Sequence, residues 1–158
     1  MIHVTTIQAK SDLDTAFQIR REVFVDEQQV PAEDEYDEFE ATSHHFLALM
    51  DGLPAGTARW RRTSHGMKLE RFAVRLAARR QGVGHALVRA VLADVFAQQP
   101  EPIERIYLHA QVTAMPLYAA FGFVAVGAPF DECGIQHYRM VLPAKRMVDE
   151  FSPAPQPR

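Results

Sequence analysis

The stretch of sequence that decides the fold is Phe72-Ala-Val-Arg-Leu-Ala-Ala-Arg79-Arg-Gln-Gly-Val-Gly84. A strand ends at Val74, a short loop follows, and two glycines open a helix. Gly82 and Gly84 remove side chains at points where a ligand can approach the backbone closely. The first N–H groups of a helix have no partner within it, and together with the helix dipole they attract an anion. Because Arg79 and Arg80 add positive charge, the stretch predicts a phosphate-binding turn between strand and helix.

Two standard phosphate motifs do not fit this turn. A P-loop requires Lys and then Ser or Thr after its last glycine, where this chain has His85 and Ala86. The dinucleotide-binding fingerprint requires a third Gly or Ala near position 87, where Leu87 stands. The alternatives left open are another phosphate-bearing ligand and a glycine-rich helix start that binds nothing.

Hydrophobic periodicity places strands and helices on both sides of the turn. Ser11, with Asp14 three residues later, approximates a capping box before the first helix. Asp51-Gly52 is a strong hairpin signal, and Gly122 is expected just after the last helix. The expected elements are strands at 2–6, 45–50, 55–62, 67–74, 106–110, 123–126 and 136–142, and helices at 12–25, 81–96 and 114–121. The strand–helix–strand unit around the turn implies a parallel pair, so the order predicts a mixed α/β (α+β) fold.

Length and composition limit the class of protein. The chain has 158 residues, 47% hydrophobic and 23% charged, which is typical of a soluble globular protein. We expect a single domain over residues 1–145, with a Pro-rich, disordered extension over 146–158. No apolar run has the length of a membrane span and the N-terminus lacks a signal peptide, so a cytoplasmic protein without a membrane partner is expected. The net charge of −3 does not favour nucleic acid as a partner.

The single cysteine, Cys133, excludes an internal disulfide and a cysteine-built metal site. We expect it to be a free thiol without a role, and no metal is expected. Charge is distributed unevenly: no Lys or Arg lies between Glu22 and Ala58, and basic residues outnumber acidic ones from Arg59 to Arg105. One part of the fold could therefore attract a cation and another an anion. The alternative is two solvated surfaces of opposite sign.

Three blocks of sequence resemble the GNAT acyltransferases. Arg79-x-x-Gly82-x-Gly84 after a strand is similar to the pyrophosphate-binding motif of that family. The strand–helix–strand that closes the family's active site is similar to Leu108-His-Ala-Gln111-x-x-Ala114-x-x-Leu117-Tyr118-x-x-x-Gly122-Phe123. The element order matches the GNAT fold over residues 2–142. A closer resemblance is to the ElaA/YjcF-type subgroup of the family. It rests on Arg20-Arg-Glu-Val-Phe-Val-Asp-Glu-Gln28, an acidic loop and His44-His45.

The resemblance implies a fold, a co-substrate and a set of binding residues. The fold would be a mostly antiparallel sheet with helices on both faces, in which the parallel strands at Val74 and Ile106 splay apart. The co-substrate would be acetyl-CoA, whose pyrophosphate suits the bare N–H groups of the turn and whose amide-rich arm suits an unpaired strand edge. The residues implied to bind coenzyme A are Phe72, Ala73, Val74, Arg79, Arg80, Gln81, Gly82, Val83, Gly84, His85 and Gln111.

The resemblance also implies the chemistry, which is attack of an amine on a thioester carbonyl. The family stabilises the oxyanion with a backbone N–H, which maps to Val74. It protonates the departing thiolate with a tyrosine, which maps to Tyr118. The alternative for Tyr118 is a side chain that only packs in the core.

Glu70 is the candidate general base. Strand alternation is expected to place it on the same face as Phe72 and Val74. The alternative is a surface carboxylate paired with Arg59 or Arg61 on the neighbouring strand. Weaker candidates for the base are His109, His44 and His45.

The acidic stretch from Asp26 to Glu40 lies where the family builds its substrate loop. Carboxylates there would orient a protonated amine, so we expect an N-acetyltransferase acting on a small cationic primary amine. The alternatives are an acyl-CoA-binding or sensing module without turnover, and a protein lysine or N-terminal acetyltransferase. A homodimer could form through exposed sheet and the extension after Pro143.

Overall fold

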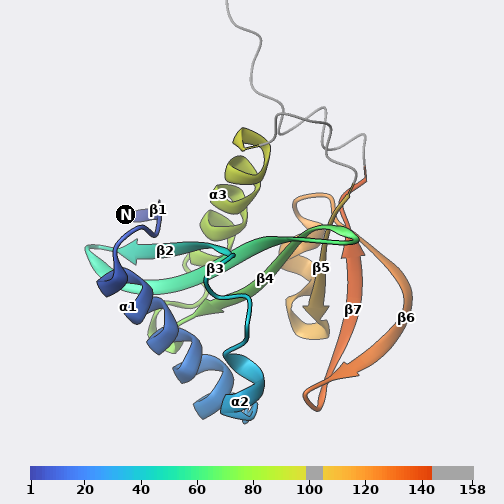
Figure 1. Ribbon diagram of the computed structural model, residues 1–158, viewed down its shortest axis with the longest axis horizontal. Helices are drawn as coiled ribbons and strands as arrows, with labels where there is room; N and C mark the ends of the chain where they lie inside the picture. Colours follow the sequence, from blue (N-terminus) through green and yellow to red (C-terminus); the bar gives the residue numbers. More distant parts are fainter. Residues whose placement is uncertain (99–104, 144–158) are drawn as a thin grey trace, which may run out of the picture.

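The computed structural model describes residues 1–98 and 105–143 (Figure 1). The predicted connector Pro100–Pro102 and the predicted Pro-rich extension over 146–158 lie outside the described residues. The strands are β1 (Ile2–Thr6), β2 (His44–Met50), β3 (Leu53–Thr63), β4 (Gly66–Val74), β5 (Ile106–Gln111), β6 (Val124–Glu132) and β7 (Ile135–Val141). The helices are α1 (Lys10–Arg20), the π-helical segment η1 (Arg21–Glu27), α2 (Ala32–Glu35), α3 (Val83–Ala97) and α4 (Met115–Ala119), with 3₁₀ turns η2 (Leu76–Ala78) and η3 (Val112–Ala114).

In the described part of the chain the strands form one seven-stranded sheet, in the order β1-β2-β3-β4-β5-β7-β6. All neighbouring strands are antiparallel except β4 and β5, which run parallel. The β4–β5 pairing covers Met67–Leu69 against Ile106–Leu108 and then stops. The predicted element order, the mixed sheet and the splayed parallel pair are therefore confirmed.

Helices cover both faces of the sheet, as expected. On one face α3 packs Leu87 and Val91 into a core that includes Phe46 of β2. On the other face α1 and η1 pack Ile19 and Val23 against strand residues that include Leu47 and Ala73. Adjacent residues of β2 enter different cores because strand side chains alternate between faces.

Gly56 lets α3 lie close to the sheet. A Cβ at this position would stand 2.9 Å from the carbonyl oxygen of Ala73, 3.0 Å from Val83 and 3.1 Å from Leu87. The first distance is shorter than real Cβ contacts and the other two are tighter than most, so any larger residue would force its neighbours to shift. The first turn of α3, and with it the glycine turn, is thereby held against β3 and β4.

The first helix differs from its prediction at both ends. It begins at Lys10, with Ala9 as N-cap and no side-chain cap bond, so the predicted capping role of Ser11 is wrong. Instead, the Ser11 carbonyl accepts a hydrogen bond from the Thr15 hydroxyl. The α-helix ends at Arg20 and the chain continues as the π-helical segment η1 rather than as α-helix to 25. Among the described residues no helix is long and apolar enough to cross a membrane.

Candidate active site

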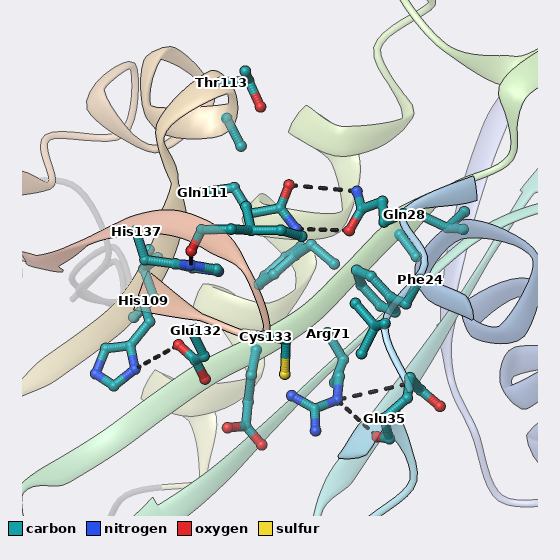
Figure 2. Close-up of a pocket in the computed structure, with 18 of the residues that line it drawn as sticks. Phe24, Gln28, Glu35, Arg71, His109, Gln111, Thr113, Glu132, Cys133 and His137 are labelled. Carbon is teal, nitrogen blue, oxygen red and sulfur yellow. Dashed lines mark hydrogen bonds and ion pairs between the residues drawn. The ribbon is translucent and has the colours of Figure 1, made fainter. Parts of the chain in front are cut away.

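A cavity of about 420 Å³ lies where β4 and β5 part (Figure 2). Its walls come from β4, β5, η1 and the β6–β7 hairpin. The predicted site residues that line it are Glu70, Phe72, Ala73, Val74, Arg79, Gln111 and Tyr118. The predicted residues Arg80–His85 do not line it and form the turn that opens α3. The structure thus gathers the two predicted catalytic residues around one cavity.

A bulge in β4 reverses the predicted orientation of Glu70. Arg59 pairs with Glu70 while Thr57 pairs with Ala73, so β4 holds one more residue than β3 over this span. The extra residue is accommodated at Arg71, whose φ is 59°. Because paired residues share a face, Glu70 lies on the face of Ala73, toward α1.

Phe72 and Val74 pack instead against the core under α3. The expectation that they share a face with Glu70 is wrong, because simple alternation does not hold across a bulge.

Glu70 is buried at 9% exposure and surrounded by cations. It forms ion pairs with Arg59, with Arg61 at 2.9 Å and with Lys68 at 3.2 Å. Burial alone would raise the pKa of this carboxyl, but the three cations outweigh burial and lower the pKa to about 2. The pairing of Glu70 with Arg59 and Arg61 agrees with the alternative expected for this residue. The carboxylate is, however, buried rather than on the surface. A carboxylate held this firmly in its ionised form is a poor proton acceptor near neutral pH.

The acidic stretch and the basic strands neutralise each other in the interior. Arg20 bonds Glu35 at 2.5 Å and Glu40 at 2.7 Å. Arg59 bonds Glu40 and Asp37, each at 2.7 Å, and both arginine side chains are 1% exposed. Burial opposes ionisation of Asp37, yet the bonds from Arg59 hold its pKa at about 2. The expectation of two separate solvated surfaces is therefore wrong for these residues.

Tyr118 lines the cavity and is 6% exposed. Its ring packs edge-on against Phe72 at 5.6 Å and Phe123 at 6.3 Å between centroids. Within residues 1–98 and 105–143 its hydroxyl forms no hydrogen bond. Burial raises the pKa of Tyr118 above its ordinary value, so the phenol stays protonated. The ring is thus a packing residue that also presents an uncommitted O–H to the cavity.

The two glycines of the turn have different surroundings. Gly82 is the N-cap of α3 with φ of 93°, and a Cβ there would meet only Ile2 at 3.6 Å. No side chain caps the helix, so the first N–H groups of α3 remain available. At Gly84 a Cβ would stand 3.3 Å from Leu117, so this glycine also permits contact with α4.

Arg79 is engaged in the protein itself. Its Nε donates to the carbonyl oxygen of Val74 at 2.9 Å, and its Nη2 pairs with Glu27 at 2.8 Å. By contrast, Arg80 is exposed on the turn with φ of 62°. Of these two arginines, Arg80 is therefore the one available to bind a phosphate. Arg79 links the end of β4 to η1.

Several residues of the cavity were not predicted as site residues. One of these is Gln28, whose side-chain amide bonds reciprocally with that of the predicted residue Gln111 across the cavity. Gln111 Nε2 donates to Gln28 Oε1 at 2.8 Å (Figure 2). The others include Phe24 from η1, Arg71 from the bulge, and a group from the β6–β7 hairpin and its strands: Glu132, Cys133 and His137. Gln28 lies inside a block that was quoted for the family resemblance. The hairpin residues carry no such signal, because only the tertiary fold returns them to the sheet. Cys133 is exposed, and burial of its sulfur, although slight, raises its pKa.

Comparisons with known proteins agree with this geometry. Residues 8–144 match the acetyltransferase (GNAT) domain family. The chain is 37% identical over 133 residues to the uncharacterized N-acetyltransferase YjcF of Bacillus subtilis, which spans 84% of this chain and 93% of that protein. Similar solved structures are an acyl-CoA N-acyltransferase from Pseudomonas aeruginosa (28% identity, TM-score 0.77) and ElaA from Escherichia coli (25% identity, TM-score 0.75). Each covers 90% of this chain and 100% of its own.

The chain therefore belongs to the GNAT acetyltransferase family. It is an acyltransferase of the ElaA/YjcF type, as the sequence blocks predicted.

Proposed function

We propose that this protein moves an acetyl group from acetyl-CoA to a primary amine within the cavity between β4 and β5. The observation that carries the proposal is the coincidence of three features around that cavity. These are the parted strands, the uncapped start of α3 at Gly82, and the free hydroxyl of Tyr118. A protein of the same fold from Elizabethkingia anophelis has a crystal structure with acetyl-CoA bound (14% identity, TM-score 0.63).

The residues present fit coenzyme A. The N–H groups from Val83 onward and the exposed Arg80 would hold the pyrophosphate. Beyond Leu69 the described part of β5 no longer pairs with β4. The carbonyl oxygen of Val74 accepts a hydrogen bond from Arg79, so the backbone at Phe72 would bond the amides of the pantetheine arm. When bound, acetyl-CoA supplies an acetyl group activated as a thioester.

Two residues that line the cavity, Val74 and Tyr118, would act directly on the thioester. The backbone N–H of Val74 would bind the carbonyl oxygen as it gains negative charge. Tyr118 would donate its proton to the departing sulfur, and its raised pKa keeps that proton in place until it is needed. Because full transfer to a thiolate is uphill for such a phenol, we expect the transfer to accompany cleavage of the C–S bond.

We propose a cationic amine as the acceptor, although fewer carboxylates are available to attract it than the sequence suggests. Glu35, Asp37 and Glu40 are neutralised by arginines and cannot attract a substrate from solvent. Asp34 is exposed and lines the cavity, and Glu33 beside it is also exposed. Asp34 on the cavity wall, with the exposed Glu33 next to it in the sequence, would recruit an ammonium group.

The test combines turnover with binding. Release of coenzyme A thiol is measured across polyamines, amino sugars, amino acids and a lysine peptide, each at low and high salt. Cationic acceptors should be preferred, and their advantage should fall as salt is added, since exposed charges are screened over about 10 Å at 0.1 M. A preference for neutral or acidic acceptors would contradict the acceptor class while leaving acetyl transfer intact.

Gly82→Val tests the binding turn, with Gly52→Val as its matched control. Both glycines have positive φ, 93° and 83°, and neither meets a close neighbour, so the two variants carry a similar strain of about 1–2 kcal/mol. We expect Gly82→Val to weaken coenzyme A binding at least tenfold in calorimetry, and Gly52→Val to leave it unchanged. Equal affinity in the two folded variants would contradict binding at this turn.

A further inference from the structure

His109 stands at the point where the two parallel strands part. The last residue of β5 that pairs with β4 is Leu108, opposite Leu69, and His109 is the next residue along the strand. Its neighbours Leu108 and Ala110 belong to the core under α3. The side chain of His109 therefore lies on the opposite face, where η1, α2 and the β6–β7 hairpin surround the cavity. This is the face away from the glycine turn, and so the side from which an acceptor would enter.

Glu132, at the end of β6, contacts the ring of His109. Nδ1 of His109 lies 3.5 Å from Oε2 of Glu132 (Figure 2). Among the described residues this Oε2 has no hydrogen-bond partner, and both side chains line the cavity. The contact with His109 lowers the pKa of Glu132, so its carboxylate is ionised at neutral pH. A carboxylate beside Nδ1 favours the ring orientation in which Nε2 remains available to a substrate.

Aromatic rings hold the imidazole in place without covering it. The ring lies edge-on to Phe130, with centroids 5.0 Å apart, and 6.0 Å from the ring of Tyr107. The side chain remains 29% exposed, so solvent and substrate can reach it. Within residues 1–98 and 105–143, Nε2 of His109 has no hydrogen-bond partner. The arrangement is an oriented imidazole with one free nitrogen at the edge of the cavity.

Charged groups from three strands face this ring. The carboxylate of Glu132 on β6 lies beside the ring, and Arg139 of β7 is the cross-strand neighbour of His109. His137 of β7 lies on the same face, with Nδ1 2.7 Å from the carbonyl oxygen of Ile135. Lys68 and Glu70 of β4 pair with each other. The charged residues Asp34, Glu35 and Arg71 also line the cavity.

We infer that His109 is the general base of the acetyl transfer and that Glu132 positions its ring, an inference that rests on the proposed function. The acceptor's ammonium gives one proton to Nε2 of His109. The freed lone pair forms the C–N bond to the acetyl carbon, the C–S bond breaks, and the sulfur takes the proton of Tyr118. The second proton on nitrogen returns to Tyr118 through water, and His109 releases its proton to solvent. One proton is released for each acetyl group transferred.

This assignment resolves a problem that the structure raises for Glu70. A pKa of about 2 leaves Glu70 little ability to accept a proton from an ammonium group. His45, another candidate from the sequence, is buried behind Glu40, whose carbonyl oxygen lies 2.8 Å from its Nε2. His44 stacks on Trp60, with centroids 4.2 Å apart, and does not line the cavity. Of the predicted candidates for a base, His109 alone lines the cavity with an imidazole nitrogen free among the described residues.

The experiment compares His109→Gln and Glu132→Gln with the control His65→Gln, an exposed histidine of the β3–β4 turn. Each variant is assayed across pH with an alkylamine, which is protonated near neutral pH, and with an alkoxyamine, which is neutral there. We expect His109→Gln to lower kcat for the alkylamine by about 10²–10⁴-fold. The loss should shrink to less than about tenfold for the alkoxyamine, because that acceptor has no ammonium proton to give. Coenzyme A affinity and the activity of His65→Gln should not change.

Glu132→Gln separates positioning from packing. Removing the carboxylate takes away the group that holds the ring with Nε2 free, so kcat for the alkylamine should fall much more than kcat for the alkoxyamine. A structural role alone would change stability and affect the two acceptors alike. Because Glu132 is 42% exposed, this variant also serves if His109→Gln folds poorly.

The outcomes distinguish this inference from the proposal on which it rests. If the wild-type protein transfers acetyl groups and folded His109→Gln stays within twofold of it, with the same pH profile for the alkylamine, His109 is not the base. An equal loss for both acceptors would also overturn the inference, because proton removal would not explain it. If the wild-type protein binds coenzyme A and acetylates none of the amines, the proposed function fails, and the inference fails with it.

Discussion

Replacing Glu70 with Gln should destabilise the fold strongly at neutral pH and hardly at all in acid. Gln has the shape of the protonated acid, so the variant mimics the wild-type protein after this one group has been titrated. The folded pKa is about 2 against an ordinary 4.5, and one pKa unit corresponds to 1.36 kcal/mol. The difference of about 2.5 units gives a stabilisation of about 3 kcal/mol at pH 7.

The sign follows from the lowered pKa. Stability from Glu70 is fully present above the unfolded pKa of 4.5 and is lost as the pH falls toward the folded pKa of about 2. The difference in unfolding free energy between wild type and Glu70→Gln should therefore fall from about 3 kcal/mol at pH 7 to about 1 kcal/mol at pH 3. Arg59 keeps Asp37 and Glu40 as partners, so the variant does not leave that guanidinium unpaired.

Urea denaturation at pH 7, 5 and 3 measures this difference, with Glu22→Gln as the control. Glu22 pairs with Arg75 at 2.8 Å, but both side chains are 35% exposed. A pair of this kind contributes at most about 1 kcal/mol. The folded Glu70→Gln protein should keep its turnover rate within a few-fold of wild type, because we infer that His109 and not Glu70 accepts the proton. Turnover slowed by about a hundredfold or more, with little loss of stability, would refute the reasoning and return Glu70 to the catalytic role.

Two further predictions concern Tyr118 and Gly56. Tyr118→Phe should lower kcat by roughly 10²–10⁴-fold with little change in stability or coenzyme A affinity, because the ring packing survives and the lost hydroxyl has no partner among the described residues. Burial raises the pKa of Tyr118 above 10, so wild-type kcat should show no basic limb from this group below pH 10, and a rate within twofold of wild type would leave it a packing residue. Gly56→Ala should cost about 1–3 kcal/mol in thermal or urea unfolding, since its Cβ would stand 2.9 Å from the Ala73 carbonyl oxygen. A variant as stable as wild type would show that α3 can move away from the sheet without cost.

Local signals in the sequence were enough to predict several elements of the fold. The period change between Val74 and Val83 predicted the strand–turn–helix, and the structure has β4 ending and α3 beginning at those residues. Asp51-Gly52 predicted a hairpin, and both residues adopt the positive φ that a tight two-residue turn requires. These predictions succeed because the determining interactions lie within a few residues of one another.

The candidate site was harder to predict because its geometry depends on distant partners. The bulge at Arg71 has no local signal: no glycine marks it, and it is recognised by the changed register against β3. One extra residue is enough to send Glu70 to the face opposite Phe72. His109 was identified only as a weak candidate, because its partner Glu132 lies 23 positions further along the chain.

The uneven charge of the sequence has its explanation in the same long-range pairing. A segment without Lys or Arg must find its counter-charges elsewhere, and here Arg59 of β3 and Arg20 of α1 supply them. Buried ion pairs contribute little net stability but strongly penalise the loss of one partner. They therefore fix the loop around Glu35 and Glu40 in one position over the sheet. Glu35 also lines the cavity, so charges that the sequence suggests for substrate attraction hold part of the cavity wall in place.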